Sequence, residues 1–222
     1  MTKQVKSKKR VAEHGEVFTN EREVKAMCDL VADECLRIDS RFLEPACGDG
    51  NFLSEILTRK LDVVTKKYKR SSYDYERNSL LAISSLYGIE IQVDNVKLCR
   101  KRLYDIWERY YKKSIKKAEQ NDEICKSIKF ILERNIVCGD ALDFRTVDNS
   151  GKKTDELIVF SQWSFATGPM IKREDYVFEQ LVNQDNESKE NEQLDILANE
   201  DNEGTLVQIY PPMHYRRLYE YE

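Results

Sequence analysis

Residues 42–52 read FLEPACGDGNF, and this stretch decides the fold that the sequence predicts. Arg41 to Glu44 has the pattern of a short strand, and apolar residues at helical spacing follow the stretch. Between strand and helix stand Gly48 and Gly50, which lack a Cβ atom and let the backbone approach a ligand closely. A strand, a glycine turn and a helix in this order are typical of a nucleotide-binding βα unit.

The segments on either side of this turn predict an α/β fold. Asn20 and Glu23 have the spacing of a capping box at the start of a helix. The polar, tyrosine-rich residues 62–77 lack a clear period and are predicted to form an insertion or loop. Further helices are predicted over 78–86, 96–110 and 124–132, and further strands over 87–91, 136–138 and 157–160. This alternation favours a mostly parallel sheet with helices on both faces.

Composition divides the chain into four predicted parts. Residues 1–10 form a basic flexible arm, and residues 11–182 form the α/β domain. Residues 183–203 are rich in Asn, Asp, Glu and Gln, so they bury too little apolar area to offset the entropy of ordering and form an acidic linker. Residues 204–222 regain aromatic side chains and are predicted to dock on the domain or on a partner.

Composition also bears on where the protein acts. No stretch approaches the roughly 20 apolar residues that span a bilayer, and the basic N-terminus lacks the apolar core of a signal peptide. We therefore expect a cytoplasmic protein that does not enter membranes. The six cysteines show no C-x-x-C spacing and there are only two histidines, so we expect buried free thiols and no metal site.

Charge is segregated along the chain, although the formal net charge is only −4. Residues 97–134 contain twelve Lys or Arg against six Asp or Glu. A basic face of this kind can contact the phosphates of DNA, and its affinity would then fall steeply with salt. Ordinary solvated helix faces explain the same pattern, and the sequence leaves both interpretations open.

The whole string EPACGDGNF, residues 44–52, resembles the glycine-rich motif of class I S-adenosylmethionine-dependent methyltransferases. Its form is similar to that of the bacterial adenine-specific (N6) DNA methyltransferases of restriction-modification systems. The segments HGEVFTN (14–20), YGIE (87–90) and CGDAL (138–142) follow the order of that family's motifs. The resemblance covers roughly residues 11–145. It implies a Rossmann-like class I methyltransferase fold with S-adenosyl-L-methionine as the cofactor.

The resemblance also implies which residues contact the cofactor. Glu44 would bond near the amino-acid end of the cofactor, Glu90 would accept the ribose hydroxyls and Asp140 would accept the adenine amino group. Each has a plainer alternative, because Glu90 can be a solvated strand end, Asp140 can cap a turn and Phe18 can staple the helix that follows it. The implied contacts are Phe18, Thr19, Glu44, Pro45, Ala46, Cys47, Gly48, Gly50, Glu90, Ile91, Asp140, Ala141 and Leu142.

The family's catalytic signature, Asn or Asp followed by Pro-Pro and an aromatic residue, is missing from the sequence. After ELIVF the chain reads SQWSFATGP, where Gln162 and Trp163 could supply an amide acceptor and a stacking ring for a flipped adenine. The prolines of Tyr210-Pro211-Pro212-Met213 lack the amide and are interpreted as a turn. The residues after Phe160 are too few for a target-recognition domain, so either recognition would come from a partner chain or this domain does not choose a DNA site.

Three functions follow from these observations. The first is an S-adenosylmethionine-binding methyltransferase domain of a DNA adenine methylation or restriction-modification system, alone or as one subunit beside a specificity or catalytic partner. The second is a catalytically inactive, methyltransferase-like protein that binds cofactor or DNA as an accessory or regulator. The third keeps the enzyme but changes the acceptor to a protein side chain or small molecule held between Trp163 and Phe165.

Overall fold

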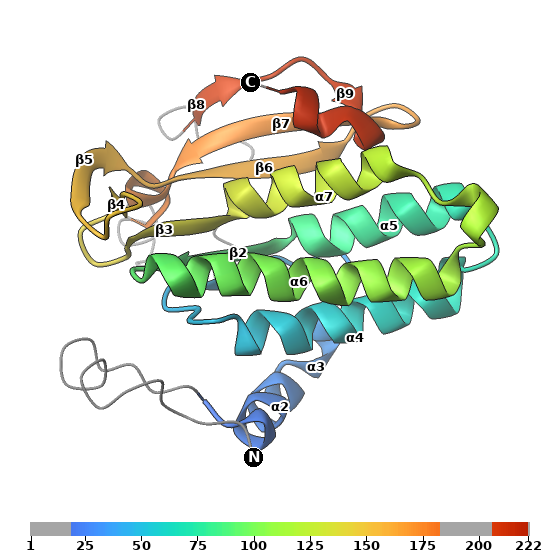
Figure 1. Ribbon diagram of the computed structural model, residues 1–222, viewed down its shortest axis with the longest axis horizontal. Helices are drawn as coiled ribbons and strands as arrows, with labels where there is room; N and C mark the ends of the chain where they lie inside the picture. Colours follow the sequence, from blue (N-terminus) through green and yellow to red (C-terminus); the bar gives the residue numbers. More distant parts are fainter. Residues whose placement is uncertain (1–18, 183–205, 222) are drawn as a thin grey trace, which may run out of the picture.

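The structure, a computed structural model, describes residues 19–182 and 206–221 (Figure 1). The predicted basic arm, the acidic linker and residues 14–18 of the upstream motif lie outside the described residues. No helix within the described ranges is both long enough and apolar enough to cross a membrane.

Three parallel strands and their connecting helices form the centre of the fold. β1 (Phe42–Glu44) pairs with β2 (Leu86–Glu90), and β2 pairs with β3 (Ile136–Asp140). The chain returns from β1 to β2 through α4 (Asn51–Tyr68) and α5 (Ser72–Ser84), and from β2 to β3 through α6 (Val93–Ser114), η1 (Lys117–Glu119) and α7 (Asp122–Asn135). These crossovers confirm an α/β architecture compatible with a Rossmann-like fold.

The prediction of a mostly parallel sheet is not met, because the sheet is mixed. β3 pairs antiparallel with β4 (Arg145–Val147), and β4 pairs antiparallel with β5 (Lys153–Leu157). Short connections of this kind can join only antiparallel neighbours, since a parallel neighbour needs a crossover of a dozen or more residues. The two pairings that follow β3 are therefore hairpins.

The strand predicted over 157–160 is only partly confirmed, because its residues are divided between two strands. Ile158 lies in neither sheet and separates β5 from β6 (Val159–Phe165), which starts a second, antiparallel sheet. β6 pairs with β7 (Met170–Val177), and β7 pairs with β8 (Leu206–Ile209) and with β9 (Met213–His214). The apolar run LIVF, residues 157–160, fits a single buried strand as well as it fits a break between two strands, so the sequence pattern cannot separate the two cases.

The two faces of the parallel strands are covered differently. Leu86 faces the large core built from α4, α5, α6 and α7, whereas Tyr87 and Ile89 face a smaller cluster with Phe160 and Phe178. The parallel strands lie in the order β1-β2-β3. Because both crossovers have the same handedness, the helices that connect these strands lie on the same face of the sheet. The expected helical layer on the second face is replaced, among the described residues, by β6 and a single helical segment at 178–182.

Residues 62–68 and 72–77 are helical and a short turn joins them, which corrects the predicted insertion or loop. They form the second half of α4 and the start of α5, and Ser71 caps α5 by accepting the Asp74 N–H. The apolar period is hard to see in the sequence because several buried positions carry polar side chains, including Lys60, Tyr75 and Glu76.

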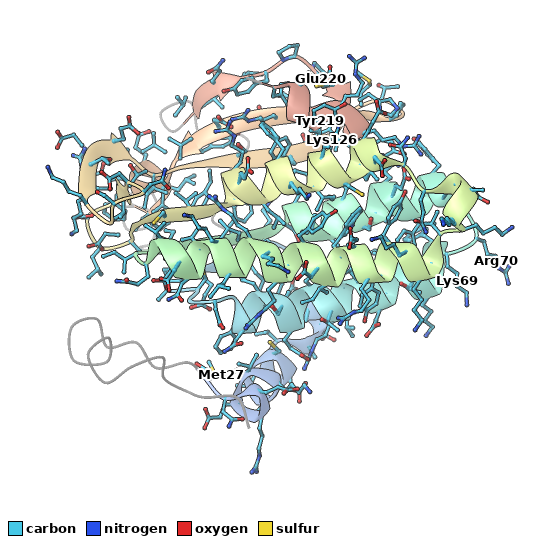
Figure 2. All side chains as sticks on the ribbon, viewed as in Figure 1. Met27, Lys69, Arg70, Lys126, Tyr219 and Glu220 are labelled. Atoms are coloured by element: carbon cyan, nitrogen blue, oxygen red, sulfur yellow. The ribbon has the colours of Figure 1, made fainter. Side chains whose placement is uncertain are left out.

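Two short helices precede β1. α2 (Glu21–Leu30) begins with the predicted capping box, in which the Asn20 side chain accepts the Arg22 N–H at 3.0 Å and the Glu23 side chain accepts the Asn20 N–H at 3.3 Å. α3 (Ala32–Leu36) follows directly. Both helices pack on α4 and leave apolar side chains exposed, among them Met27, which projects from α2 in Figure 2.

A buried lysine fixes the start of β1. Lys60 of α4 donates to the backbone oxygens of Ile38 and Ser40 and, at 2.5 Å, to Ser85 Oγ. Burial lowers the pKa of Lys60 to about 7. The lysine therefore links the segments that lead into β1 and β2.

A buried carboxylate ties the C-terminal segment to the helical layer. Glu76 of α5 is fully buried and accepts hydrogen bonds at 2.7 Å from Tyr111 of α6 and from Tyr215 and Arg216 of η2 (Tyr215–Glu220). Leu218 of η2 is buried as well, and its N–H donates to Ser127 of α7. The hydrogen bond from Tyr215 to Glu76 joins residues 139 positions apart, and the one from Leu218 to Ser127 joins residues 91 positions apart.

Replacing Glu76 by glutamine should destabilise the protein by about 2–4 kcal/mol, because the uncharged amide cannot satisfy three buried donors and leaves Arg216 without its charge partner. Urea unfolding monitored by circular dichroism measures the change. Glu119→Gln, at an exposed position, serves as the control and should stay within about 0.5 kcal/mol of the parent. Equal stability of the two variants would contradict this role of Glu76.

Candidate functional site

The carboxyl ends of the three parallel strands bring predicted site residues to one edge of the sheet. β1 ends at Glu44, β2 at Glu90 and β3 at Asp140. The register pairs Glu44 with Gly88 and Glu90 with Cys138, so each strand projects two residues beyond the previous one. Ligands of open α/β sheets bind at this edge. We call the segment from Glu44 to Gly50 together with Glu90 the cofactor edge.

The glycine turn adopts a conformation that requires glycine. Gly48 has φ +54° and Gly50 has φ +89°, both in the left-handed region. A Cβ atom at Gly50 would lie 2.7 Å from Cys99 Sγ of α6, so the turn has no room for a side chain there. The Gly50 N–H donates to the Cys47 oxygen, and the Cys47 N–H donates to the Ile89 oxygen, both at 2.9 Å. The turn is thereby anchored to β2.

Cys47 packs under the turn rather than toward solvent. It is buried, and a Cβ atom on Gly88 of β2 would lie 2.9 Å from its Sγ atom. A hydrogen bond with the Cys99 thiol, together with burial, raises the pKa of the Cys47 thiol, so it stays protonated. The Cys47 thiol therefore packs against β2 beneath the turn.

Sequence reasoning missed Arg102, which clamps the turn from α6. Its guanidinium donates to both carboxylate oxygens of Asp49, at 3.2 and 2.7 Å, and to Asn51 Oδ1 at 2.6 Å. A planar fork bound to a carboxylate fixes geometry as well as charge. The one signal in the sequence is that Arg102 follows Cys99 by one helical turn, and this places both residues on the side of α6 that meets the glycine turn.

Glu44 and Glu90 flank the turn in different environments. Burial raises the pKa of Glu44, an effect opposed by the hydrogen bond from the Ala46 backbone. The Glu90 carboxylate accepts the Gln92 N–H at 2.8 Å, which orients it at the start of α6. Both carboxylates act electrostatically on Cys47, so both lie near the turn.

Asp140 is already engaged. Its Oδ1 accepts the Leu142 N–H at 2.9 Å, and its Oδ2 lies 2.5 Å from Lys153 Nζ. The hydrogen bond with Lys153 lowers the pKa of Asp140. In the structure, Asp140 therefore caps the turn that follows β3. Leu142 is 91% exposed, and Ala141 packs against the smaller cluster that contains Phe160 and Phe178.

The remaining predicted contacts lie around the turn. The Asn51 side chain donates to the Thr19 oxygen at 3.3 Å, which brings the upstream motif next to the start of α4. Pro45 and Ala46 form the first bend after β1. Ile91 follows β2, and its oxygen accepts from Cys138 Sγ at 3.8 Å. Phe18 lies outside the described residues.

Gln162 and Trp163 lie elsewhere. Trp163 is 5% exposed, its Nε1 donates to Asn135 Oδ1 at 3.1 Å, and its ring meets Phe130 edge-on. Gln162 pairs with Glu174 in the antiparallel sheet. Trp163 and Phe165 line a cavity of about 700 Å³, as the third function supposed, but the cavity also contacts residues that precede β1 and β2. It therefore opens at the amino ends of the strands, away from the glycine turn.

Comparison with known proteins adds an independent finding. The sequence model of the family described as "MmeI, DNA-methyltransferase domain" matches residues 16–198, more than half of the 222-residue chain. No curated protein and no solved structure matches the chain. The matched range contains the glycine turn, both carboxylates of the cofactor edge and β6.

Gly50→Ala should lower the free energy of unfolding by about 2–4 kcal/mol, since it adds a clash with Cys99 to the strain of a left-handed alanine. Gly151→Ala is the matched control, because Gly151 has φ +84° and nothing within 4 Å of its Cβ position. The control should lose only about 1–2 kcal/mol. Urea denaturation compares them, and equal losses would show that close packing at Gly50 is unimportant.

Arg102→Lys should loosen the glycine turn, because an ammonium cannot reproduce the fork to Asp49 and Asn51. We expect the Gly50 N–H to exchange with solvent deuterium about 5- to 30-fold faster, which corresponds to about 1–2 kcal/mol of local stability. Arg109→Lys on the exposed side of the same helix is the control. If the exchange rate of the Gly50 N–H is unchanged in Arg102→Lys, Arg102 does not stabilise the glycine turn.

Proposed function

We propose, from the premise that this chain belongs to the MmeI DNA-methyltransferase domain family of the restriction-modification type, that it binds S-adenosyl-L-methionine at the cofactor edge. The methyl group of this cofactor would be transferred to the N6 atom of adenine in DNA. The observation that carries the proposal is the glycine turn, whose left-handed backbone stands between two strand-end carboxylates. Bare backbone beside oriented carboxylates suits a cationic nucleoside.

The chain's own residues bind and orient the cofactor. We assign Glu90 to the ribose hydroxyls, because its carboxylate is held at the end of β2 by the Gln92 N–H and can accept two donors. We assign Glu44 to the amino-acid end, where a ligand ammonium would favour the ionised carboxylate that burial disfavours. When bound, S-adenosyl-L-methionine supplies an electrophilic methyl group. The clamp from Arg102 holds the turn in place before the ligand arrives.

Asp140, Ala141 and Leu142 are omitted from the proposed contacts. The Asp140 carboxylate bonds to Lys153 and to the Leu142 backbone, and Leu142 projects into solvent. The purine would then rest on the backbone after β2 around Ile91, together with Thr19 from the upstream motif.

We further propose that a partner polypeptide supplies the acceptor side. Phe42 donates to Ser85, and alternate residues of a parallel strand bond to the same neighbour, so the Leu43 N–H and C=O point away from β2. No strand within the described residues pairs with that edge of β1. Leu43 is exposed, and so are apolar side chains of α2 and α3, the two helices that precede β1 in the chain. An unpaired edge flanked by apolar surface suits an added strand.

Calorimetric titration with S-adenosyl-L-methionine tests the proposal. The parent protein should bind, and Glu90→Ala should bind about 10- to 100-fold more weakly, because charged hydrogen bonds to the ribose are lost. Glu119→Ala makes the same charge change at an exposed site and should match the parent. No heat from the parent at millimolar ligand, or full affinity in Glu90→Ala, would reject the assignment.

A radiolabelled methyl-transfer assay on duplex DNA then tests catalysis. Incorporation that appears only when a partner polypeptide is added supports the split site. Robust incorporation by this chain alone would overturn the need for a partner, and its absence with every partner added would favour an accessory role.

A further inference from the structure

Eight exposed cations gather at the far end of the helical layer. Lys66, Lys67, Lys69 and Arg70 stand at the end of α4 and in the turn after it, and Lys112, Lys113, Lys116 and Lys117 stand at the end of α6 and in the segment after it. The two helix ends lie at the same end of the molecule, and Lys69 and Arg70 project outward there (Figures 1 and 2). We call these eight residues the distal basic patch.

The patch stands on a fixed scaffold. The buried Tyr75 hydroxyl lies 3.4 Å from Thr65 Oγ1 of α4 and hydrogen-bonds to Ser114 of α6, so one side chain joins both helix ends. Gln120 donates to the Ile115 oxygen at 2.8 Å and holds the segment that follows α6. The cations therefore keep a set spacing instead of fraying independently.

The cations of the patch are largely without acidic partners. Lys112 pairs with Glu108 at 3.0 Å, and none of the other seven takes part in an ion pair within the described residues. Asp62, which lies one to two turns before the end of α4, accepts a hydrogen bond from Tyr110. In a chain with a formal net charge of −4, such a cluster produces a strong local positive potential.

The helix dipole explains only part of the patch. Cations in the last turn of a helix are stabilised by its dipole, which accounts for the lysines at 66, 67, 112 and 113. Lys69 is the C-cap of α4, whereas Arg70, Lys116 and Lys117 lie beyond the caps of α4 and α6. An anion bound from outside the protein would offset the repulsion between these clustered cations.

We propose that the distal basic patch is a sequence-independent contact for the phosphates of duplex DNA, separate from the cofactor edge. α4 begins at the glycine turn and its 18 residues span about 27 Å, so the patch lies that far from the turn. At a rise of about 3.4 Å per base pair, this is about 8 base pairs of duplex. Packed helices lie about 8–10 Å apart, a separation between the widths of the two DNA grooves.

Duplex DNA fits the patch better than an anionic membrane. Membrane-surface helices combine cations with large apolar side chains. Within the described residues, Tyr73 is the one exposed large apolar side chain near the patch, whereas the others lie on α2, α3, β1, β8, α6 near its start and the turn after β3. The choice of DNA rests on family membership, whereas binding at the patch needs no cofactor.

Fluorescence anisotropy with a labelled 30-base-pair duplex of mixed sequence tests the proposal between 50 and 200 mM salt. Changing Lys66, Lys67, Lys69 and Arg70 together to glutamine should weaken binding about 10- to 100-fold at 50 mM salt and reduce the log–log salt slope by about 2–4. The matched control changes four cations that pair with acids elsewhere, Lys25, Arg37, Lys172 and Arg217, to glutamine, and should stay within about threefold of the parent.

A second variant, Lys113, Lys116 and Lys117 to glutamine, should show the same loss, which keeps the test valid if the first variant folds poorly. Cofactor affinity should be unchanged in both, so failure of the proposed function is measured separately. Equal losses in the patch and control variants, no duplex binding by the parent, or patch-dependent binding to phosphatidylserine vesicles in preference to duplex would each overturn the proposal.

Discussion

The close approach of the glycine turn to α6 is the constraint on which the rest of the site depends. Gly50 has no space for a side chain because Cys99 stands against it, and Arg102, one helical turn further on, clamps Asp49 and Asn51. The turn therefore takes its shape from a helix that begins after the next strand. Packing between α4 and α6, which sets this approach, also brings together the helix ends that carry the distal basic patch.

The described part of the chain brings the glycine turn and two strand-end carboxylates to one edge of the sheet. Its parallel strands advance from β1 to β3 in one direction, so the crevice of a doubly wound sheet, which opens where the strand order reverses, is bounded on one side only. After β3 the chain turns into hairpins and an antiparallel sheet that buries Trp163 in the core. Among the described residues, the strands that follow β3 therefore do not extend the parallel part of the sheet.

Local signals predicted the local structure well. The Asn20–Glu23 capping box and the strand–turn–helix of FLEPACGDGNF depend on neighbouring residues and occur as expected. Residues 62–77 were misjudged because Lys60 and Glu76, which look like surface residues, are buried with partners distant in sequence. The strand direction after β3 and the clamp from Arg102, 53 residues from Asp49, depend on tertiary contacts that no local pattern encodes.

A crystal structure of the protein soaked with S-adenosylhomocysteine tests the central claim most directly, because it locates the ligand without relying on turnover. The account predicts ligand density over Gly48 and Gly50, with the ribose hydroxyls within hydrogen-bond distance of the Glu90 carboxylate. Density in the cavity beside Trp163 and Phe165 instead, with the glycine turn uncontacted, would contradict it.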